Sequence, residues 1–204
     1  MSKLQTNLKQ IVTTLNKYND MIKQIIPEQY KELVYIETTG TQYLQNVTLS
    51  PNFKIEYDVV LTQTSEHYNF FDNNTSVPML WLDESMQLEA NATTPRYKVN
   101  SDTRYKIAND NISGNHVSVD GNVVITQSKI SGGSWDVNLL NRNGTVPFKG
   151  KIYGIKIWDN TTLTLNLIPV VRNSDNKVCF YDLVSGKYFE NKGTGEFISR
   201  WCKI

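Results

Sequence analysis

This chain of 204 residues contains few of the residue types that mark disulfide-rich, zinc-binding or membrane-spanning proteins. It has only two cysteines, Cys179 and Cys202, which could pair if their strands are neighbours and are otherwise buried thiols. Its two histidines, His67 and His116, stand apart from each other and from the cysteines, which disfavours a zinc site. No apolar run approaches the roughly 20 residues that cross a bilayer, so we expect no membrane insertion.

The chain also has no excess of one charge, since its 21 Lys and Arg residues are nearly balanced by 20 Asp and Glu residues. The basic residues are scattered, which argues against nucleic acid as a partner. The apolar residues of the first segment are spaced rather than continuous, and no small-residue cleavage site follows them. We therefore expect no signal peptide, and synthesis in a cytoplasm without export by a classical route.

The chain does contain a seven-residue apolar repeat at its start. An average spacing of about 3.5 residues is typical of a coiled-coil seam. The repeat predicts an α-helix over residues 3–26, ended by Pro27, within a first domain of residues 1–28. Its apolar members are Leu4, Leu8, Ile11, Leu15, Tyr18, Ile22 and Ile25.

We predict that this helix oligomerises through its a and d positions. Mixed Leu and Ile at these positions favours three or four strands, and a homotrimer is our preferred interpretation. Because three heptads alone are marginally stable, the helix could instead lie against its own domain or require another protein to bind. The predicted seam residues are Leu8, Ile11, Leu15, Tyr18, Ile22 and Ile25.

The second domain, residues 29–204, has the patterning of β-strands. Residues 53–62 alternate apolar and polar side chains with period 2, which predicts a long half-buried strand. Asp120-Gly121, between two β-rich runs, is typical of a type I′ hairpin. About a dozen short strands with frequent turn signals predict an all-β, two-sheet antiparallel sandwich of the jelly-roll type.

Four segments of this domain resemble concanavalin A-like, LamG-type jelly-roll domains. They are Tyr35–Leu44, Lys149–Ile157, Ile168–Arg172 and Phe180–Phe197. The resemblance spans residues 33–200 and is weak between Ser65 and Thr145. It implies a sandwich carried by phage and prophage fibre or receptor-binding proteins, or by bacterial surface proteins, whose partner is usually a carbohydrate. In its closing segment, Gly193 and Gly195 are expected to supply positive φ in the final turn.

Glycoside hydrolases belong to the same superfamily and pair two carboxylates in one cleft. Here Glu56 and Asp58 share a strand face, but Leu61 or Val60 stands where the acid/base partner is needed. We therefore expect no enzymatic activity and interpret the two carboxylates as a solvated sheet face. A hydrolase remains the third interpretation of the function.

An oxygen-rich loop raises the question of calcium. Asp72, Asn74 and Ser76 have the 1-3-5 spacing of a calcium loop, but Val77 replaces the glycine needed at position 6. Asp83 also replaces the usual Glu at position 12. We expect no metal and no cofactor, with Asp72, Asn74 and Asp83 as the weak candidates for calcium.

A glycan site on a sandwich combines an exposed aromatic ring with side chains that hydrogen-bond hydroxyl groups. Trp135 alternates with Val137 and Leu139 and is interpreted as core. The candidate glycan-binding residues are Trp81, Asp83, Asn141, Arg142 and Trp158.

Together with the heptad repeat, the resemblance to LamG-type domains implies a non-enzymatic phage virion structural protein, a head or tail appendage made in the cytoplasm of a host bacterium. It would trimerise through its helix and present jelly-roll heads to host-surface carbohydrate or to other virion proteins, gaining avidity from several copies. The alternative is a monomeric, lectin-like carbohydrate-binding module of a bacterial or prophage surface protein.

Overall fold

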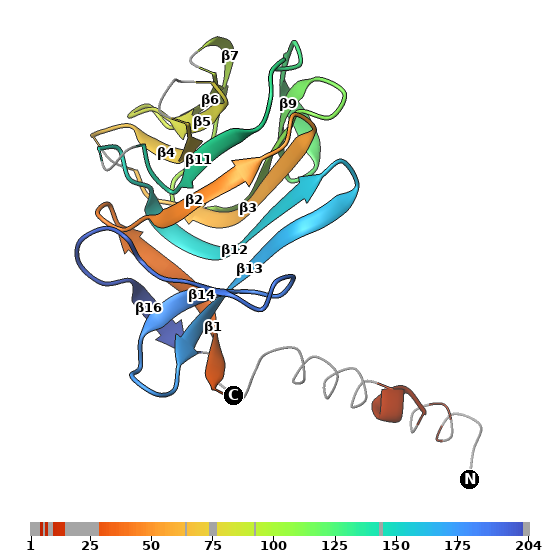
Figure 1. Cartoon of the computed structure of the whole chain (residues 1–204), viewed down its shortest axis with the longest axis vertical. Coiled ribbons are helices and arrows are strands. Elements are labelled where there is room, and N and C mark those ends of the chain that lie inside the picture. Colours follow the sequence, from red (N-terminus) through yellow and green to blue (C-terminus); the bar gives the residue numbers. More distant parts are fainter. Residues whose placement is uncertain are drawn as a thin grey trace.

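The computed structural model describes residues 5, 7, 10–14, 29–63, 65–73, 77–91, 93–142 and 145–201. From Tyr30 onward these residues form two antiparallel sheets that pack face to face (Figure 1), which confirms the all-β, two-sheet prediction.

The larger sheet runs in the order β10-β9-β8-β3-β12-β1-β13-β14-β15, and β16 pairs with β1 outside this path. Its strands are β1 (Tyr30–Thr39), β3 (Phe53–Leu61), β8 (Arg104–Asp110), β9 (Asn115–Val119), β10 (Asn122–Gln127), β12 (Lys149–Asp159), β13 (Thr162–Arg172), β14 (Val178–Asp182), β15 (Tyr188–Phe189) and β16 (Ile198–Trp201). Strand β12 changes partner along its length, because its first half pairs with β1 and its second half with β13.

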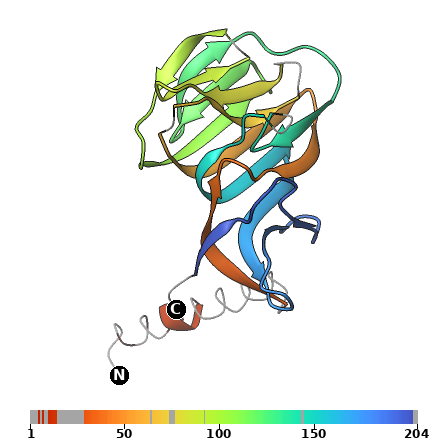
Figure 2. The same ribbon diagram turned by 90° about the vertical axis from the view of Figure 1, so that its left-hand side faces the viewer.

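The smaller sheet runs in the order β2-β11-β4-β5-β6-β7. Its strands are β2 (Leu44–Leu49), β4 (Tyr68–Asp72), β5 (Met79–Leu82), β6 (Gln87–Ala90), β7 (Thr93–Lys98) and β11 (Trp135–Leu139). In the rotated view of Figure 2, the part of the larger sheet formed by β1, β13, β14 and β16 extends below the region where the two sheets face each other.

Aromatic side chains join the two sheets in the core. On β3, residues alternate between buried and half-buried from Phe53 to Leu61, which confirms the predicted strand. The Tyr57 ring lies 5.3 Å from that of Phe70 on β4, and its hydroxyl donates to the Phe70 carbonyl at 2.8 Å. Burial raises the pKa of Tyr57 well above its ordinary value. Trp135 is half-buried and packs against this core, as predicted.

The opening segment Tyr35–Leu44 and the closing segment Asn191–Phe197 are hydrogen-bonded to each other. The Thr194 amide donates to the Thr41 carbonyl at 3.1 Å, and the Thr41 hydroxyl donates back to the Thr194 carbonyl at 2.7 Å. The Gln42 amide group donates to the Glu196 carbonyl at 3.0 Å. The segments that carry the family resemblance therefore fasten the two ends of the domain together.

Two glycines shape the closing turn for different reasons. Gly195 has φ +71°, the left-handed conformation that was predicted for it. The prediction of positive φ for Gly193 is wrong, because Gly193 is absent from the left-handed region. Glycine is required at this position because there is no room for a side chain: a Cβ atom on Gly193 would lie 1.8 Å from the Thr41 carbonyl oxygen.

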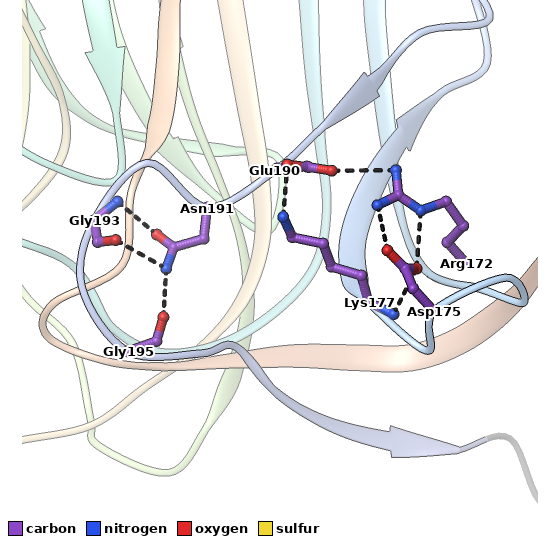
Figure 3. A network of polar contacts seen from close by, with 7 residues as sticks. All are labelled: Arg172, Asp175, Lys177, Glu190, Asn191, Gly193 and Gly195. Carbon is purple, nitrogen blue, oxygen red and sulfur yellow. Dashed lines mark hydrogen bonds and ion pairs between the residues drawn. The ribbon is translucent and has the colours of Figure 1, made fainter.

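An ionic network fixes the hairpin between β13 and β14 (Figure 3). Arg172 donates twice to Asp175, at 2.9 and 2.6 Å, and lies 3.1 Å from Glu190. Lys177 donates to Glu190 at 2.7 Å. Beside it, the Asn191 side chain accepts from the Gly193 amide at 2.8 Å and donates to the Gly195 carbonyl at 2.8 Å.

Residues 10–14 are helical, and the Thr14 hydroxyl donates to the Gln10 carbonyl at 2.9 Å. Of the predicted seam, Ile11 lies in this turn and is 56% exposed. The remaining seam residues lie outside the described residues: Leu8, Leu15, Tyr18, Ile22 and Ile25. No helix within the described ranges has the length and hydropathy needed to cross a membrane. Cys179 is a buried free thiol, and Cys202 lies outside the described residues.

Candidate functional site

A bulge in β4 places polar side chains on the outer face of the smaller sheet. The register against β5 shifts between Asn69 and Phe71, so Phe70 and Phe71 both enter the core. Asn69 and Asp72, on either side of this pair, consequently point away from the core. Both side chains are nevertheless buried, at 1% and 0% exposure.

A cross-strand row continues from Asn69 over the neighbouring strands. Asn69 pairs with Trp81 on β5, and Trp81 pairs with Glu89 on β6. Leu80 and Leu82 belong to the core, so the Trp81 ring between them lies on the outer face with Asn69 and Glu89. We call the following set the outer polar face: Asn69, Asp72, Trp81, Asp83, Glu89, Arg96, Asn141 and Arg142.

The charged groups of the outer polar face are paired with one another. Arg96 Nε lies 2.5 Å from Glu89 Oε2, and Arg96 Nη1 lies 3.3 Å from Asp83 Oδ2. At the other end of β4, Arg142 Nε lies 3.6 Å from Asp72 Oδ2. These ion pairs balance the charge of the buried carboxylates, although Glu89 Oε2 makes its contact with Arg96 as an ion pair and not as a hydrogen bond of ordinary geometry.

The neutral groups of the same face are not satisfied in this way. Asn69 Oδ1, Trp81 Nε1, Asn141 Oδ1 and Asn141 Nδ2 are buried and have no hydrogen-bond partner among the described residues. Leaving such a group unpaired costs on the order of 1–3 kcal/mol, so these atoms favour a polar occupant. Together they offer both donors and acceptors.

His67 covers the Trp81 ring from the solvent side. The two rings are stacked with centroids 4.8 Å apart, and His67 Nδ1 lies 3.1 Å from Glu84 Oε2. The side chains of His67 and Glu84 are about half exposed, at 47% and 54%. A ligand can therefore reach the indole by displacing a surface side chain without opening the core.

The structure places three of the five predicted glycan-binding residues on this face, namely Trp81, Asp83 and Arg142, and Asn141 precedes Arg142 in the chain. Trp81 is half-buried, and Asp83 caps the β5–β6 turn by accepting from the Ser85 and Gln87 amides at 2.9 and 2.8 Å. Asn141 and Arg142 follow β11 beside β4. The fifth, Trp158, is placed differently: it lies on β12 of the larger sheet, with Lys54 Nζ 5.0 Å from its ring centroid.

The weak calcium candidates do not converge. Asp72 pairs with Met79 at one end of the β4–β5 hairpin, whereas Asp83 follows Leu82, which pairs with Tyr68 at the other end. Each carboxylate also contacts an arginine. The described residues contain no group of three or more His, Cys, Asp or Glu side chains suited to a metal ion. Asn74 lies outside the described residues.

Sequence reasoning missed Asn69, Glu89, Arg96 and His67. Asn69 lies in the run Tyr68–Asp72, where the bulge disrupts alternation, and its face cannot be read from the sequence. Glu89 between Leu88 and Ala90 did carry a usable signal, since alternation places it opposite the core. Its proximity to Arg96 depends on the β6–β7 register, which only the structure supplies.

Comparisons with known proteins identify a fold neighbour and no family. No protein-family model matches this chain, and no curated protein matches it. Among solved structures, the chain is similar to a candidate carbohydrate-binding protein from Bacteroides ovatus, with a TM-score of 0.58 and 11% identity. The match covers 85% of this chain and 61% of the neighbour, so this chain spans less than two thirds of the neighbour's length. At this identity the likeness establishes the sheet-rich sandwich fold alone.

Proposed function

We propose that this protein is a lectin-like carbohydrate-binding module whose outer polar face binds a neutral saccharide. The observation that carries the proposal is the set of buried, unpaired neutral atoms of Asn69, Trp81 and Asn141. Sugar hydroxyls both donate and accept hydrogen bonds, and the apolar face of a sugar ring packs on an indole. The fold neighbour, itself a candidate carbohydrate-binding protein, supports this class of ligand.

The pairing of charges on this face favours an uncharged ligand. Asp83 and Glu89 are held by Arg96, and Asp72 contacts Arg142. An acidic or basic ligand would have to compete with these ion pairs, whereas a neutral sugar would not.

We further propose that the module has no catalytic activity. Glu56 and Asp58 lie on the outer face of the larger sheet, and Asp58 accepts from Arg104 at 2.7 and 2.9 Å. A glycosidase needs one carboxyl group as an acid and a second as nucleophile or base in one cleft. The pairing of Asp58 with arginine and the position of Leu61 in the core leave this strand without that arrangement.

The test is a screen of the full chain against neutral and acidic glycans, followed by isothermal titration calorimetry on each hit. We expect a neutral oligosaccharide to bind and Trp81→Ala to weaken it at least tenfold. Trp158→Ala is the matched control, because it removes a tryptophan from the opposite sheet. Equal losses in the two variants, or no loss in Trp81→Ala, would refute the assignment of the site.

A second proposal concerns the assembly that carries the head. The heptad repeat and the exposure of Ile11 and Val12, at 56% and 49%, favour an oligomerising helix of a phage virion appendage. Light scattering should give about three times the 23.4 kDa monomer mass for the full chain and a monomer for a chain lacking residues 1–27. A monomeric full chain would remove the support for a trimeric appendage.

A further inference from the structure

The larger sheet carries a groove on its outer face, on the opposite side of the sandwich from the outer polar face. The groove has a volume of about 200 Å³ and is lined by side chains from β3, β8, β12 and β13. Neither the sequence patterns nor the fold neighbour assigns a role to it.

The change of partner along β12 produces this groove. Ile152 pairs with Ile36 on β1, whereas Ile155 pairs with Leu167 on β13, so two strands diverge beside residues 153 and 154. The register against β3 also shifts between Ile152 and Gly154. Gly154 allows the backbones of β12 and β13 to approach closely at this point, because a Cβ atom there would lie 3.3 Å from the Leu167 carbonyl oxygen.

Among the charged side chains that line the groove, the carboxylates are paired and the lysines are not. Asp58 is neutralised by Arg104 through two hydrogen bonds, and Glu56 lies 3.9 Å from Lys54. Lys106 and Lys156 also line the groove, and neither ammonium group has an ion-pair or hydrogen-bond partner among the described residues. The lining itself thus has two carboxylates and two lysines. Because both carboxylates are paired with cations from outside the lining, the two unpaired lysines favour a ligand with negative charge.

The aromatic and neutral polar side chains of the groove indicate what the uncharged part of the ligand should be. The Tyr153 ring lines the groove and is held in place by Arg104, whose guanidinium carbon lies 3.7 Å from the ring centroid. Asn166 contributes an amide that can donate and accept. Glu56 and Asp58 can accept hydrogen bonds from hydroxyl groups. They would repel a polymer whose backbone carries a negatively charged phosphate at every unit.

We propose that this groove is a second binding site, for a saccharide that carries a carboxylate. Lys106 and Lys156 would bind the carboxylate, and Glu56, Asn166 and Tyr153 would bind the sugar hydroxyls and ring. This inference goes beyond the neutral-saccharide site and does not depend on it, because the two sites lie on opposite faces of the sandwich. A single domain with both sites bridges a neutral and an acidic glycan.

The experiment uses the full chain and a panel of uronate- and sialate-containing oligosaccharides, each beside its neutral methyl ester. We expect at least one acidic member to bind and its ester to bind at least tenfold more weakly. The double variant Lys106→Gln, Lys156→Gln should lower the affinity for the acid at least tenfold. The double variant Lys187→Gln, Lys192→Gln removes the same charge from exposed positions elsewhere and should leave the affinity unchanged.

Each other outcome contradicts the proposal. It fails if no acidic oligosaccharide binds, if acid and ester bind equally, or if the two lysine double variants lose affinity equally. It also fails if duplex DNA binds as tightly through the same two lysines, because the groove would then be a general polyanion surface. Trp81→Ala separates the two sites: it should leave acid binding intact whether or not the neutral-saccharide proposal is correct.

Discussion

The junction of the opening and closing segments and the outer polar face use their side-chain amides in opposite ways. Where the opening and closing segments meet, the amides of Gln42 and Asn191 are bonded to backbone atoms of the other segment or of their own turn. On the outer polar face, by contrast, the amides of Asn69 and Asn141 retain unpaired atoms among the described residues. Satisfied amides stabilise the fold, and unsatisfied ones mark where a ligand can contribute the missing bonds.

The largest loss of stability is expected from a substitution where the closing segment contacts the opening segment. Gly193→Ala places a methyl group against the Thr41 carbonyl, at a backbone atom that cannot move aside. We expect the free energy of unfolding to fall by about 3 kcal/mol, the upper end for overpacking, in urea denaturation. Gly133→Ala is the control, because nothing lies within 4 Å of its added Cβ, and it should change stability little. Equal stability of the two variants would contradict the account of this contact.

The next prediction compares the two kinds of asparagine directly. Asn191→Leu removes the acceptor of the Tyr43 and Gly193 amides, so unfolding should become easier by about 2 kcal/mol. Asn69→Leu removes an amide with an unpaired buried oxygen, so stability should rise by about 1 kcal/mol while saccharide binding is lost. Denaturation and calorimetry on both variants measure this. A loss of stability in Asn69→Leu as large as in Asn191→Leu would show that the comparison is wrong.

The next effect is smaller and is a gain, not a loss: removing the His67 side chain should strengthen saccharide binding. Because His67 stacks on Trp81, a saccharide must displace it before packing on the indole. His67→Ala should therefore raise the affinity for the neutral saccharide several-fold in calorimetric titration. Glu84→Gln, which keeps the histidine in place, serves as the control. A lower affinity in His67→Ala would show that the imidazole contacts the ligand directly.

The smallest effect lies in the β13–β14 hairpin. The hydrogen bonds from Arg172 lower the pKa of Asp175 to about 2. Because the folded-state value lies below the unfolded value, the contribution of Asp175 to stability is present above about pH 4 and is lost as the pH falls toward 2. An NMR titration of the Asp175 carboxyl carbon should give a midpoint near 2, and Arg172→Gln should raise it. A midpoint near 4 in the unmodified protein would contradict the paired geometry of Figure 3.

Local patterns predicted the strands well, and they drew attention to some residues of the candidate site. Period 2 located β3 from Phe53 to Leu61, and Asp120-Gly121 forms a turn in which both residues have positive φ, as a type I′ hairpin requires. Trp81 and Asp83 could be named as candidates because an aromatic ring and a carboxylate near a strand end are visible in the sequence.

The rest of the site depends on long-range pairing. Asn69 reaches the outer face through a bulge, and Glu89 meets Arg96 through the β6–β7 register. Trp158 and Trp81 are both candidate aromatic residues in the sequence, yet they lie on different sheets. The groove at Gly154 arises where β12 stops pairing with β1 and begins to pair with β13. No local sequence pattern predicts such a change of partner.

The most direct test of the central claim is the indole N–H region of a ¹H–¹⁵N NMR spectrum during titration of the full chain with its neutral saccharide. Four tryptophans give resolvable indole signals, which single Trp→Phe variants assign. The account predicts that the Trp81 Nε1–H signal shifts most, because that donor is unpaired and gains a hydrogen bond. A shift confined to Trp158, or binding that leaves the Trp81 signal unchanged, would contradict a saccharide site on the outer polar face.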